Sequence, residues 1–396
     1  MIFPKGGQQL GVPTEAARLA SFYALYFAAL GAFVPYWGPY LKDAGLSALQ
    51  IGILTALVQV SKVFAPNLWG SLAERTGDRL RVIHWATLSA AAGFALLFFT
   101  HDFFGIALAT LLFSFFWAAS LPLVETTTLD WSRRTGGRYG RVRLWGSLGF
   151  IAVSLSLGGL IEHWGQWLFL VVVLALLLGV WLAGLGLPGG ERHPVEEGAR
   201  VSALALLRRP GVLAFFLGCA LEQASHGPYY AFYSIYLGQH GISGLYIGLL
   251  WAFAVLCEVG FFLVSERVVA SMGLRKLLIA SFSFTLVRWA IIAAWPNLGF
   301  IVFAQVLHAA SYAGFHAAAV NLTYRQFAPA ERVQGQALYT SIAFGFGGAI
   351  GGLAAGAIWQ QWGGSASFVA AALATGLGLL LILLAGRRMQ ALQPAG

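Results

Sequence analysis

The chain has 396 residues, of which 59% are hydrophobic and only 10% are charged, and its formal net charge is +9. Soluble domains carry roughly 25% charged residues, so this composition excludes an ordinary water-soluble domain and indicates a protein whose surface faces lipid. The basic residues recur between apolar segments instead of forming one patch, which argues against a nucleic-acid-binding protein.

The first sixteen residues lack the apolar core of a signal peptide, so we expect the first apolar segment to remain as a membrane helix. A spanning helix needs about 20 apolar residues. The predicted helices cover residues 17–41, 48–72, 82–100, 103–131, 141–163, 165–187, 210–238, 243–265, 274–295, 298–324, 333–360 and 365–386. These segments predict an all-α membrane protein of twelve transmembrane helices.

One long polar segment separates the sixth and seventh predicted helices. It predicts two six-helix bundles, residues 1–190 and 210–396, joined by a linker over 191–209. Of the 24 lysines and arginines, 20 fall on the linker's side of the predicted helices. By the positive-inside rule, this bias places both termini and the linker in the cytoplasm.

The loop after the second predicted helix reads GSLAERTGDR over residues 70–79 and resembles the signature loop of the major facilitator superfamily. It departs from that signature at Glu74, where aspartate is usual, and at Asp78, where a basic residue is usual. A weaker copy over 265–276 follows the eighth predicted helix, as two related halves require. The resemblance implies the major facilitator fold with two pseudo-symmetric halves.

The same resemblance implies a gating role for the charged residues of this loop. They lie at a helix end, where they suit charge pairing with the other half of the molecule. We therefore expect Glu74, Arg75 and Arg79 to form a cytoplasmic latch that stabilises the outward-open state.

A second resemblance runs from the fourth into the fifth predicted helix, PLVETTTLDWSRRTGGRYGRVRLWGSLGF. This stretch is similar to lactose permease and closer to the phenylpropionate permease group. The resemblance to lactose permease implies that Glu125 and Arg143 bind the solute. Arg143, Ser147 and Phe150 also share one helical face, which offers a forked donor, a hydroxyl and a ring. The alternative is an ion pair that only locks two helices together.

Ionisable residues inside spans are costly and tend to face a wet cavity or one another. Glu222 and His226 are four residues apart on the seventh predicted helix, so their side chains can touch. By resemblance to lactose permease, Glu258, Arg288 and His308 match the acid, arginine and histidine of its C-terminal half. We expect these five residues to form the proton-coupling group, in which Glu222 or Glu258, with Glu258 favoured, holds the proton. Arg288 is a candidate partner of Glu258, and His226 of Glu222.

His308 is not expected to pass the proton on, because Ser311 stands three residues later, where lactose permease has its proton-carrying acid. A uniporter or exchanger without proton coupling is the alternative.

Aromatic residues are dense where a central cavity is expected. The candidates for solute contact are Tyr26, Trp37, Tyr229, Tyr230 and Trp251. Tryptophan and tyrosine also form interfacial belts, so anchoring to the membrane surface is the alternative reading for some of them.

The intramembrane Lys62 either pairs with an acid or attracts an anionic solute, and the sequence does not separate these roles. The two cysteines, Cys219 and Cys257, lie in apolar stretches and indicate neither a disulfide nor a metal site. The chain also lacks a GxxxxGK[ST] loop, which excludes a fused ATP motor of that type.

Taken together, the motifs predict a secondary transporter and no enzyme, cofactor or bound metal. The expected partners are a small-molecule substrate, protons and the lipid bilayer, with no nucleic acid and a monomeric chain in a bacterial inner membrane. The favoured hypothesis is proton symport of an aromatic carboxylate such as a phenylpropanoid acid. A sugar or nucleoside:proton symporter and an exporter of amphiphilic compounds remain the alternatives.

Overall fold

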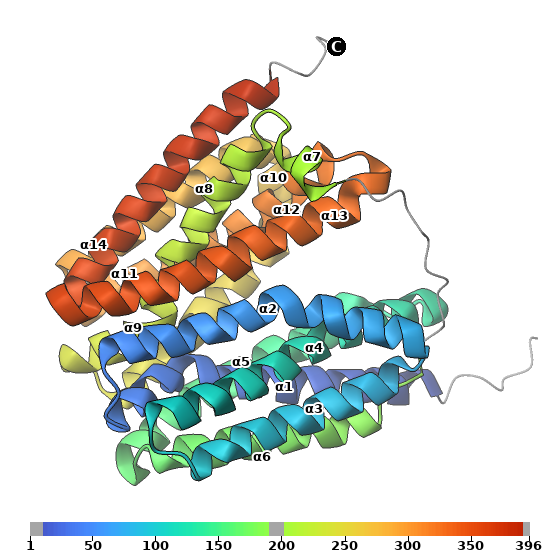
Figure 1. Ribbon diagram of the computed structural model, residues 1–396, viewed down its shortest axis with the longest axis vertical. Coiled ribbons are helices and arrows are strands. Elements are labelled where there is room, and N and C mark those ends of the chain that lie inside the picture. The colour runs from blue at the N-terminus through green and yellow to red at the C-terminus, as the bar shows by residue number, and fades with distance from the viewer. Residues whose placement is uncertain (1–10, 190–201, 391–396) are drawn as a thin grey trace, which may run out of the picture.

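The computed structural model describes residues 11–189 and 202–390, and nearly all of them are helical (Figure 1). The first group of helices comprises α1 (Gly11–Asp43), α2 (Ala48–Thr76), α3 (Arg79–Ala95), η1 (Leu96–Phe98), α4 (Phe103–Thr135), α5 (Tyr139–Trp164) and α6 (Trp167–Leu185). The second comprises α7 (Ala203–Leu207), α8 (Val212–Ser225), α9 (Gly227–Gln239), α10 (Gly244–Ala294), α11 (Leu298–His308), η2 (Ala309–Gly314), α12 (Phe315–Gln326), η3 (Pro329–Glu331), α13 (Arg332–Tyr339), η4 (Thr340–Gly347) and α14 (Gly348–Gln390).

Helix ends fall where the sequence supplies caps. Ser47 and Gln50 form a capping box at the start of α2, and Asp102 accepts hydrogen bonds from backbone N–H groups at the start of α4. Gly77 and Gly136 end α2 and α4 in the left-handed region, with φ of 64° and 71°. These caps explain why local sequence alone placed the boundaries within a few residues.

Within the described residues, nine helices are long and apolar enough to cross a membrane. Two of these stretches, Gly244–Ala294 and Arg332–Gly386, are much longer than one span needs. Each contains a glycine with non-helical backbone: Gly273 has φ 77° and Gly363 has φ 81°. The shorter α8 and α9 meet at His226, and Pro228 stands in the first turn of α9. Helices thus occupy all the ranges predicted from the sequence.

The predicted linker over 191–209 falls largely outside the described residues, because the structure describes none of 190–201. The described remainder contains α7 and then Arg209, whose guanidinium donates to both carboxylate oxygens of Glu331 at 2.8 and 2.6 Å. This hydrogen-bonded pair lowers the pKa of Glu331. The Arg209–Glu331 pair links the residues just before α8 to the connection between α12 and α13.

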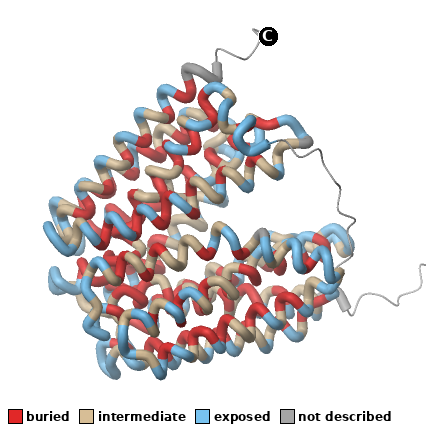
Figure 2. Tube along the Cα trace, in the orientation of Figure 1, coloured by how far each residue is buried: buried red, intermediate tan, exposed pale blue. Residues whose placement is uncertain are grey.

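The helices form two groups that meet on the left of Figure 1 and diverge toward the right. One apolar core is built almost entirely from α1 to α6. A second core belongs to α7, α8 and later helices, and a third joins Phe150 of α5 to residues of α9, α10, α11 and α14. Buried positions therefore follow the facing sides of the helices (Figure 2).

The two helix groups approach each other closely at glycine residues, which have no side chain to keep the backbones apart. A Cβ on Gly52 of α2 would lie 2.6 Å from the Gly352 carbonyl oxygen and 2.8 Å from the Gly356 Cα of α14. Gly158 of α5 and Gly244 of α10 likewise each face the other's carbonyl oxygen. These contacts lie near the ends of α1, α5 and α9 and the starts of α2 and α10, a region that we call the closed end.

Candidate functional site

The first charged group of the interior joins α4 and α5. Nε of Arg143 lies 3.8 Å from Oε1 of Glu125, and both side chains are partly exposed, by 30% and 38%. The Arg143 guanidinium carbon is 3.9 Å from the ring centroid of Phe27 and 5.5 Å from that of Tyr23, both on α1. The structure thus brings together the acid and the arginine that sequence predicts, with an aromatic wall from α1.

The other residues that were predicted to contact the solute lie in different environments, some in a buried cluster and some partly exposed. Phe150, Tyr229 and Trp251 belong to one buried cluster that joins α5 to α9 and α10, and Tyr230 packs against it. Ser147 is only partly buried. The cluster therefore places rings from both helix groups around one region.

The two predicted aromatic residues of α1 lie in the core of the first group. The Tyr26 ring lies 5.4 Å from the Phe27 ring, and Phe27 in turn faces Arg143. Trp37 stacks between Phe33 and Tyr40, at 5.0 and 5.8 Å. Tyr26 is thus close to the first charged group, whereas the contacts of Trp37 are with core aromatics.

The second charged group lies where α10 and α11 pack together. Nε2 of His308 is 2.6 Å from Oε1 of Glu258, and both side chains are largely buried. The Tyr312 ring stacks on the His308 ring at 5.3 Å. The sequence suggested Arg288 as the partner of Glu258. The side chain in direct contact with the Glu258 carboxyl group is instead His308, because α11 presents that ring to α10.

Arg288 is completely buried and has a neutral partner. Its Nη2 donates to Oε1 of Gln305 at 3.0 Å, and its guanidinium carbon lies 4.3 Å from the Tyr229 ring centroid and 4.5 Å from that of Trp289. Among the described residues, its Nε and Nη1 have no hydrogen-bond partner. A buried cation without a counter-ion is unusual enough to mark a functional group.

Glu222 and His226 do not contact each other through their side chains. Oε1 of Glu222 accepts from the Thr285 hydroxyl at 2.5 Å, whereas Nδ1 of His226 lies 2.9 Å from the Glu222 backbone oxygen. The reason is that α8 ends at Ser225, so His226 caps the helix instead of extending the same face. Both side chains are nevertheless fully buried near Arg288.

Sequence reasoning missed two polar residues of this region. Gln305 bridges Arg288, the Tyr229 hydroxyl and the Leu250 carbonyl oxygen, and Thr285 holds Glu222. Gln305 stands three residues before His308 in an otherwise apolar stretch, FIVFAQVLHAA. A buried amide in such a stretch is the signal that was available.

Lys62 lies at the middle of α2 and donates to Oε1 of Gln59 at 2.7 Å. No acidic side chain within the described parts of the chain pairs with it. Its neighbour Val63 and the amide of Gln59 face Gly345 and Gly348 of the second group. Lys62 therefore lies beside the face of α2 that turns toward the other helix group.

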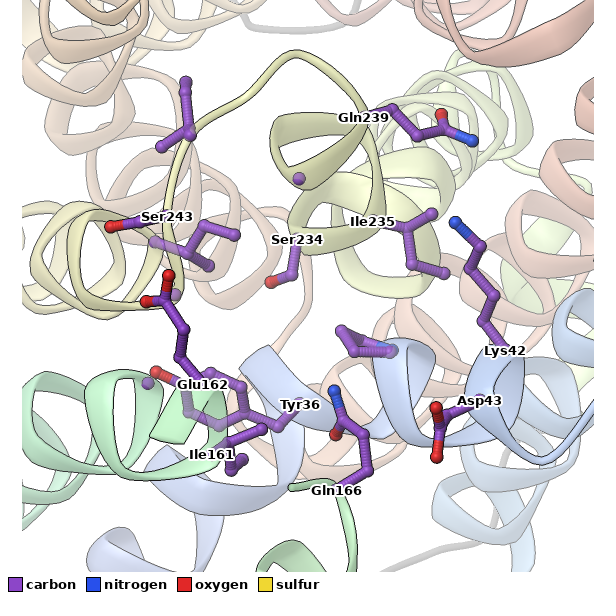
Figure 3. Close-up of a pocket in the computed structure, with 16 residues that line it drawn as sticks. Tyr36, Lys42, Asp43, Ile161, Glu162, Gln166, Ser234, Ile235, Gln239 and Ser243 are labelled. Carbon is purple, nitrogen blue, oxygen red and sulfur yellow. The ribbon is translucent and has the colours of Figure 1, made fainter. Parts of the chain in front are cut away.

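A cavity of about 650 Å³ lies at the closed end, between α1, α5, α9 and the start of α10. In Figure 3, Glu162 and Ser243 lie on one side of it, and Lys42, Asp43 and Gln239 lie on the other. Its wall includes Tyr36, whose hydroxyl donates to the Ser154 carbonyl oxygen at 2.7 Å. The cavity is separate from both charged groups, none of whose members lines it.

The predicted latch residues lie at the end opposite the closed end. Arg79 pairs with Asp130 of α4 at 2.8 Å, within the first helix group. Glu74 and Arg75 are exposed and form no ion pair with any residue in the described ranges. Pairing across the two groups therefore does not occur in this conformation.

The chain is similar to known proteins over most of its length. Residues 16–370 match the model of a family described as "MFS_1 like family". The chain is 31% identical over 367 residues to "Probable 3-phenylpropionic acid transporter" of Escherichia coli (strain K12), covering 90% of this chain and 94% of the relative. It is 29% identical over 378 residues to "Maltose permease" of Geobacillus stearothermophilus, covering 93% of each. A crystal structure of nucleoside transporter NupG superposes with a TM-score of 0.82 at 18% identity, covering 95% of this chain and 99% of that one.

Proposed function

The chain belongs to the MFS_1-like family and is a membrane transporter of the major facilitator superfamily, not an enzyme, and from this premise we propose that it is a proton-coupled symporter of a small organic solute. The observation that carries the coupling is the largely buried contact between the Glu258 carboxyl group and the His308 imidazole, whose Oε1 and Nε2 atoms are 2.6 Å apart. A buried acid on a membrane helix is a natural site for a proton that binds and leaves with the solute.

For the solute, we favour an aromatic carboxylate. Two features support this choice: aromatic rings from both helix groups surround the region, and arginines stand beside it in each group. The relative that is 31% identical is named for 3-phenylpropionic acid. Maltose is the second candidate, because a relative of similar coverage is named for that sugar.

The test is uptake into proteoliposomes that contain the purified protein, with an imposed pH gradient, acidic outside. We expect concentrative uptake of radiolabelled 3-phenylpropionate that collapses when a protonophore is added. Protein-free liposomes supply the essential control, since the uncharged acid crosses bilayers unaided. Concentrative uptake of maltose or uridine instead would reject the carboxylate, and indifference to the gradient would reject proton coupling.

We propose twelve spans for this transporter. Division of the two longest stretches at Gly273 and Gly363, with α8 and α9 counted as one span, raises the nine candidates to twelve. On this basis the halves are residues 1–190 and 210–396, with the linker 191–209 and both termini in the cytoplasm. We further propose that the protein is a monomer in a bacterial inner membrane, with its closed end outward and its latch end inward as the positive-inside rule predicts.

If Glu74 and Arg75 form a latch, a substitution at Glu74 should change the transport rate more than the affinity for the solute. In this inward-facing arrangement Glu74 and Arg75 are exposed, and we propose that they pair across the halves only when the cytoplasmic end closes. Replacing Glu74 by alanine should then slow transport by roughly tenfold, since a charge-assisted contact is worth about 1.5 kcal/mol. Initial uptake rates and equilibrium solute binding are the two measurements, and a large loss of affinity at an unchanged rate would count against the latch.

A further inference from the structure

We propose that Arg288 is the carboxylate-binding residue of the solute site, whereas Arg143 is not. This inference rests on the proposed function, because it assigns the charged end of the proposed aromatic carboxylate to one of two arginines. It also changes the role of Arg288 from a member of the proton-coupling group to a direct ligand of the solute.

The Arg288 guanidinium is buried, and two of its nitrogens have no hydrogen-bond acceptor among the described residues. The side chain has no solvent exposure, yet its Nε and Nη1 find no acceptor among the described residues. Within the described residues, its Nη2 donates to the uncharged amide of Gln305 and no carboxylate accepts from it. Buried charges are normally paired, because the loss of hydration must be offset by an opposite charge. The guanidinium therefore lacks the anion that its burial demands.

The two nearby acids each direct one carboxylate oxygen to a partner other than Arg288, and the Oε2 atom of Glu222 has no hydrogen-bond partner among the described residues. Oε1 of Glu258 pairs with His308 at 2.6 Å, and Oε1 of Glu222 accepts from Thr285 at 2.5 Å. Neither carboxylate forms an ion pair with Arg288 in the described structure, although both lie close enough to feel its charge. Arg288 is thus without a carboxylate partner among the described residues, and a solute can supply one.

Arg143, in contrast to Arg288, already has a carboxylate partner. Nε of Arg143 already has Glu125 at 3.8 Å, and nearly a third of its side chain is exposed. A solute carboxylate at Arg143 would have to displace Glu125 and would compete with solvent. At Arg288 it would displace nothing with a formal charge, and the low dielectric surroundings would strengthen the contact.

Aromatic rings surround the Arg288 guanidinium. Tyr229 and Trp289 cover the guanidinium with their rings, and Trp251 lies 4.6 Å from the Tyr229 ring. Rings at this spacing stack favourably on another aromatic ring. The site therefore offers aromatic surfaces beside a guanidinium, and we expect the buried Tyr229 ring to move so that an aryl carboxylate can enter.

Equilibrium binding to the purified full-length protein in nanodiscs tests the assignment. The probes are 3-phenylpropionate and its neutral counterpart of nearly the same shape, 3-phenylpropanamide. Wild type should bind the acid at least tenfold more tightly than the amide. Arg288→Gln should lose that preference while it still binds the amide, which also shows that the variant is folded. Arg143→Gln should keep the preference, and Arg267→Gln, which changes an exposed arginine, should match wild type.

The opposite pattern overturns the proposal: full acid preference in Arg288→Gln, or its loss in Arg143→Gln. If Arg288→Gln does not fold, Arg288→Lys decides, because its compact ammonium should weaken acid binding several-fold and leave amide binding unchanged. Equal effects on both probes, or none, would then reject the assignment. Failure of the proposed function gives a different result, since wild type would neither bind nor concentrate 3-phenylpropionate, and the assignment would fall with it.

Discussion

Replacing Glu258 by glutamine should abolish proton-driven accumulation of the solute. Glutamine keeps the size of the side chain and an oxygen that can face His308, whose Nε2 lies 2.6 Å from Oε1 of Glu258, but it cannot bind a proton reversibly. One proton that moves with one carboxylate carries no net charge, so a gradient of one pH unit can concentrate the solute about tenfold, equal to about 1.4 kcal/mol. In the variant, the part of this accumulation that exceeds that of protein-free liposomes should disappear.

The matched comparison is Glu222→Gln, which alters a second buried acid that is held by Thr285. Accumulation ratios and counterflow exchange should be measured for both variants in the same proteoliposomes. We expect Glu258→Gln to keep exchange, which needs no net proton movement, and Glu222→Gln to keep part of its accumulation. If both variants still concentrate solute fully, neither acid carries the proton and the coupling residue lies elsewhere.

Leucine in place of Gly158 should have the second large effect. The Gly158 position of α5 faces the Gly244 carbonyl oxygen of α10 and the Tyr36 hydroxyl, so a side chain there keeps the closed end from forming. Overpacking a tight contact costs about 1–3 kcal/mol. Such a cost corresponds to a loss of about 5- to 150-fold in the population of the closed end. Transport should fall by a comparable factor.

The control is the neighbouring residue. A Cβ on Gly159 meets only the Leu245 side chain, at 3.7 Å, so Gly159→Leu should transport nearly as well as wild type. Opening of the closed end can be followed by thiol labelling at Ile235→Cys, a buried cavity position, in a chain with Cys219 and Cys257 replaced. Faster labelling in Gly158→Leu, but not in Gly159→Leu, is the expected result. Equal transport by both leucine variants would show that this contact does not limit the cycle.

Part of the candidate site was predictable because intramembrane charges stand out in an apolar sequence. Glu125 and Arg143 were expected to pair, and their side chains do lie together at 3.8 Å. The pairing of Glu258 was not predictable, because helix periodicity says which residues share a face but not which neighbouring helix that face meets. Arg288 was the expected partner, whereas the packing of α11 on α10 brings His308 into contact with Glu258.

The relation between Glu222 and His226 shows a second limit. A spacing of four residues predicts side-chain contact only within a continuous helix. Here α8 ends at Ser225 and α9 begins at Gly227, so His226 turns to the backbone oxygen of Glu222. Pro228 was a visible signal of this break, since a proline cannot continue the hydrogen-bonding pattern of a preceding turn.

The sequence by itself determined that this chain is a multi-span helical membrane protein and approximately which ranges are helical, but not that α10 and α14 run on through Gly273 and Gly363 or that α8 and α9 divide at His226. Apolar length, charge bias and caps are local properties, so they can be read without knowing which helices touch. Only the tertiary structure decided that glycines close one end and that the Arg288 guanidinium has two nitrogens without an acceptor among the described residues. Whether a buried donor is satisfied depends on every helix packed around it, and residues far apart in the chain, such as Gln305 and Tyr229, supply those contacts.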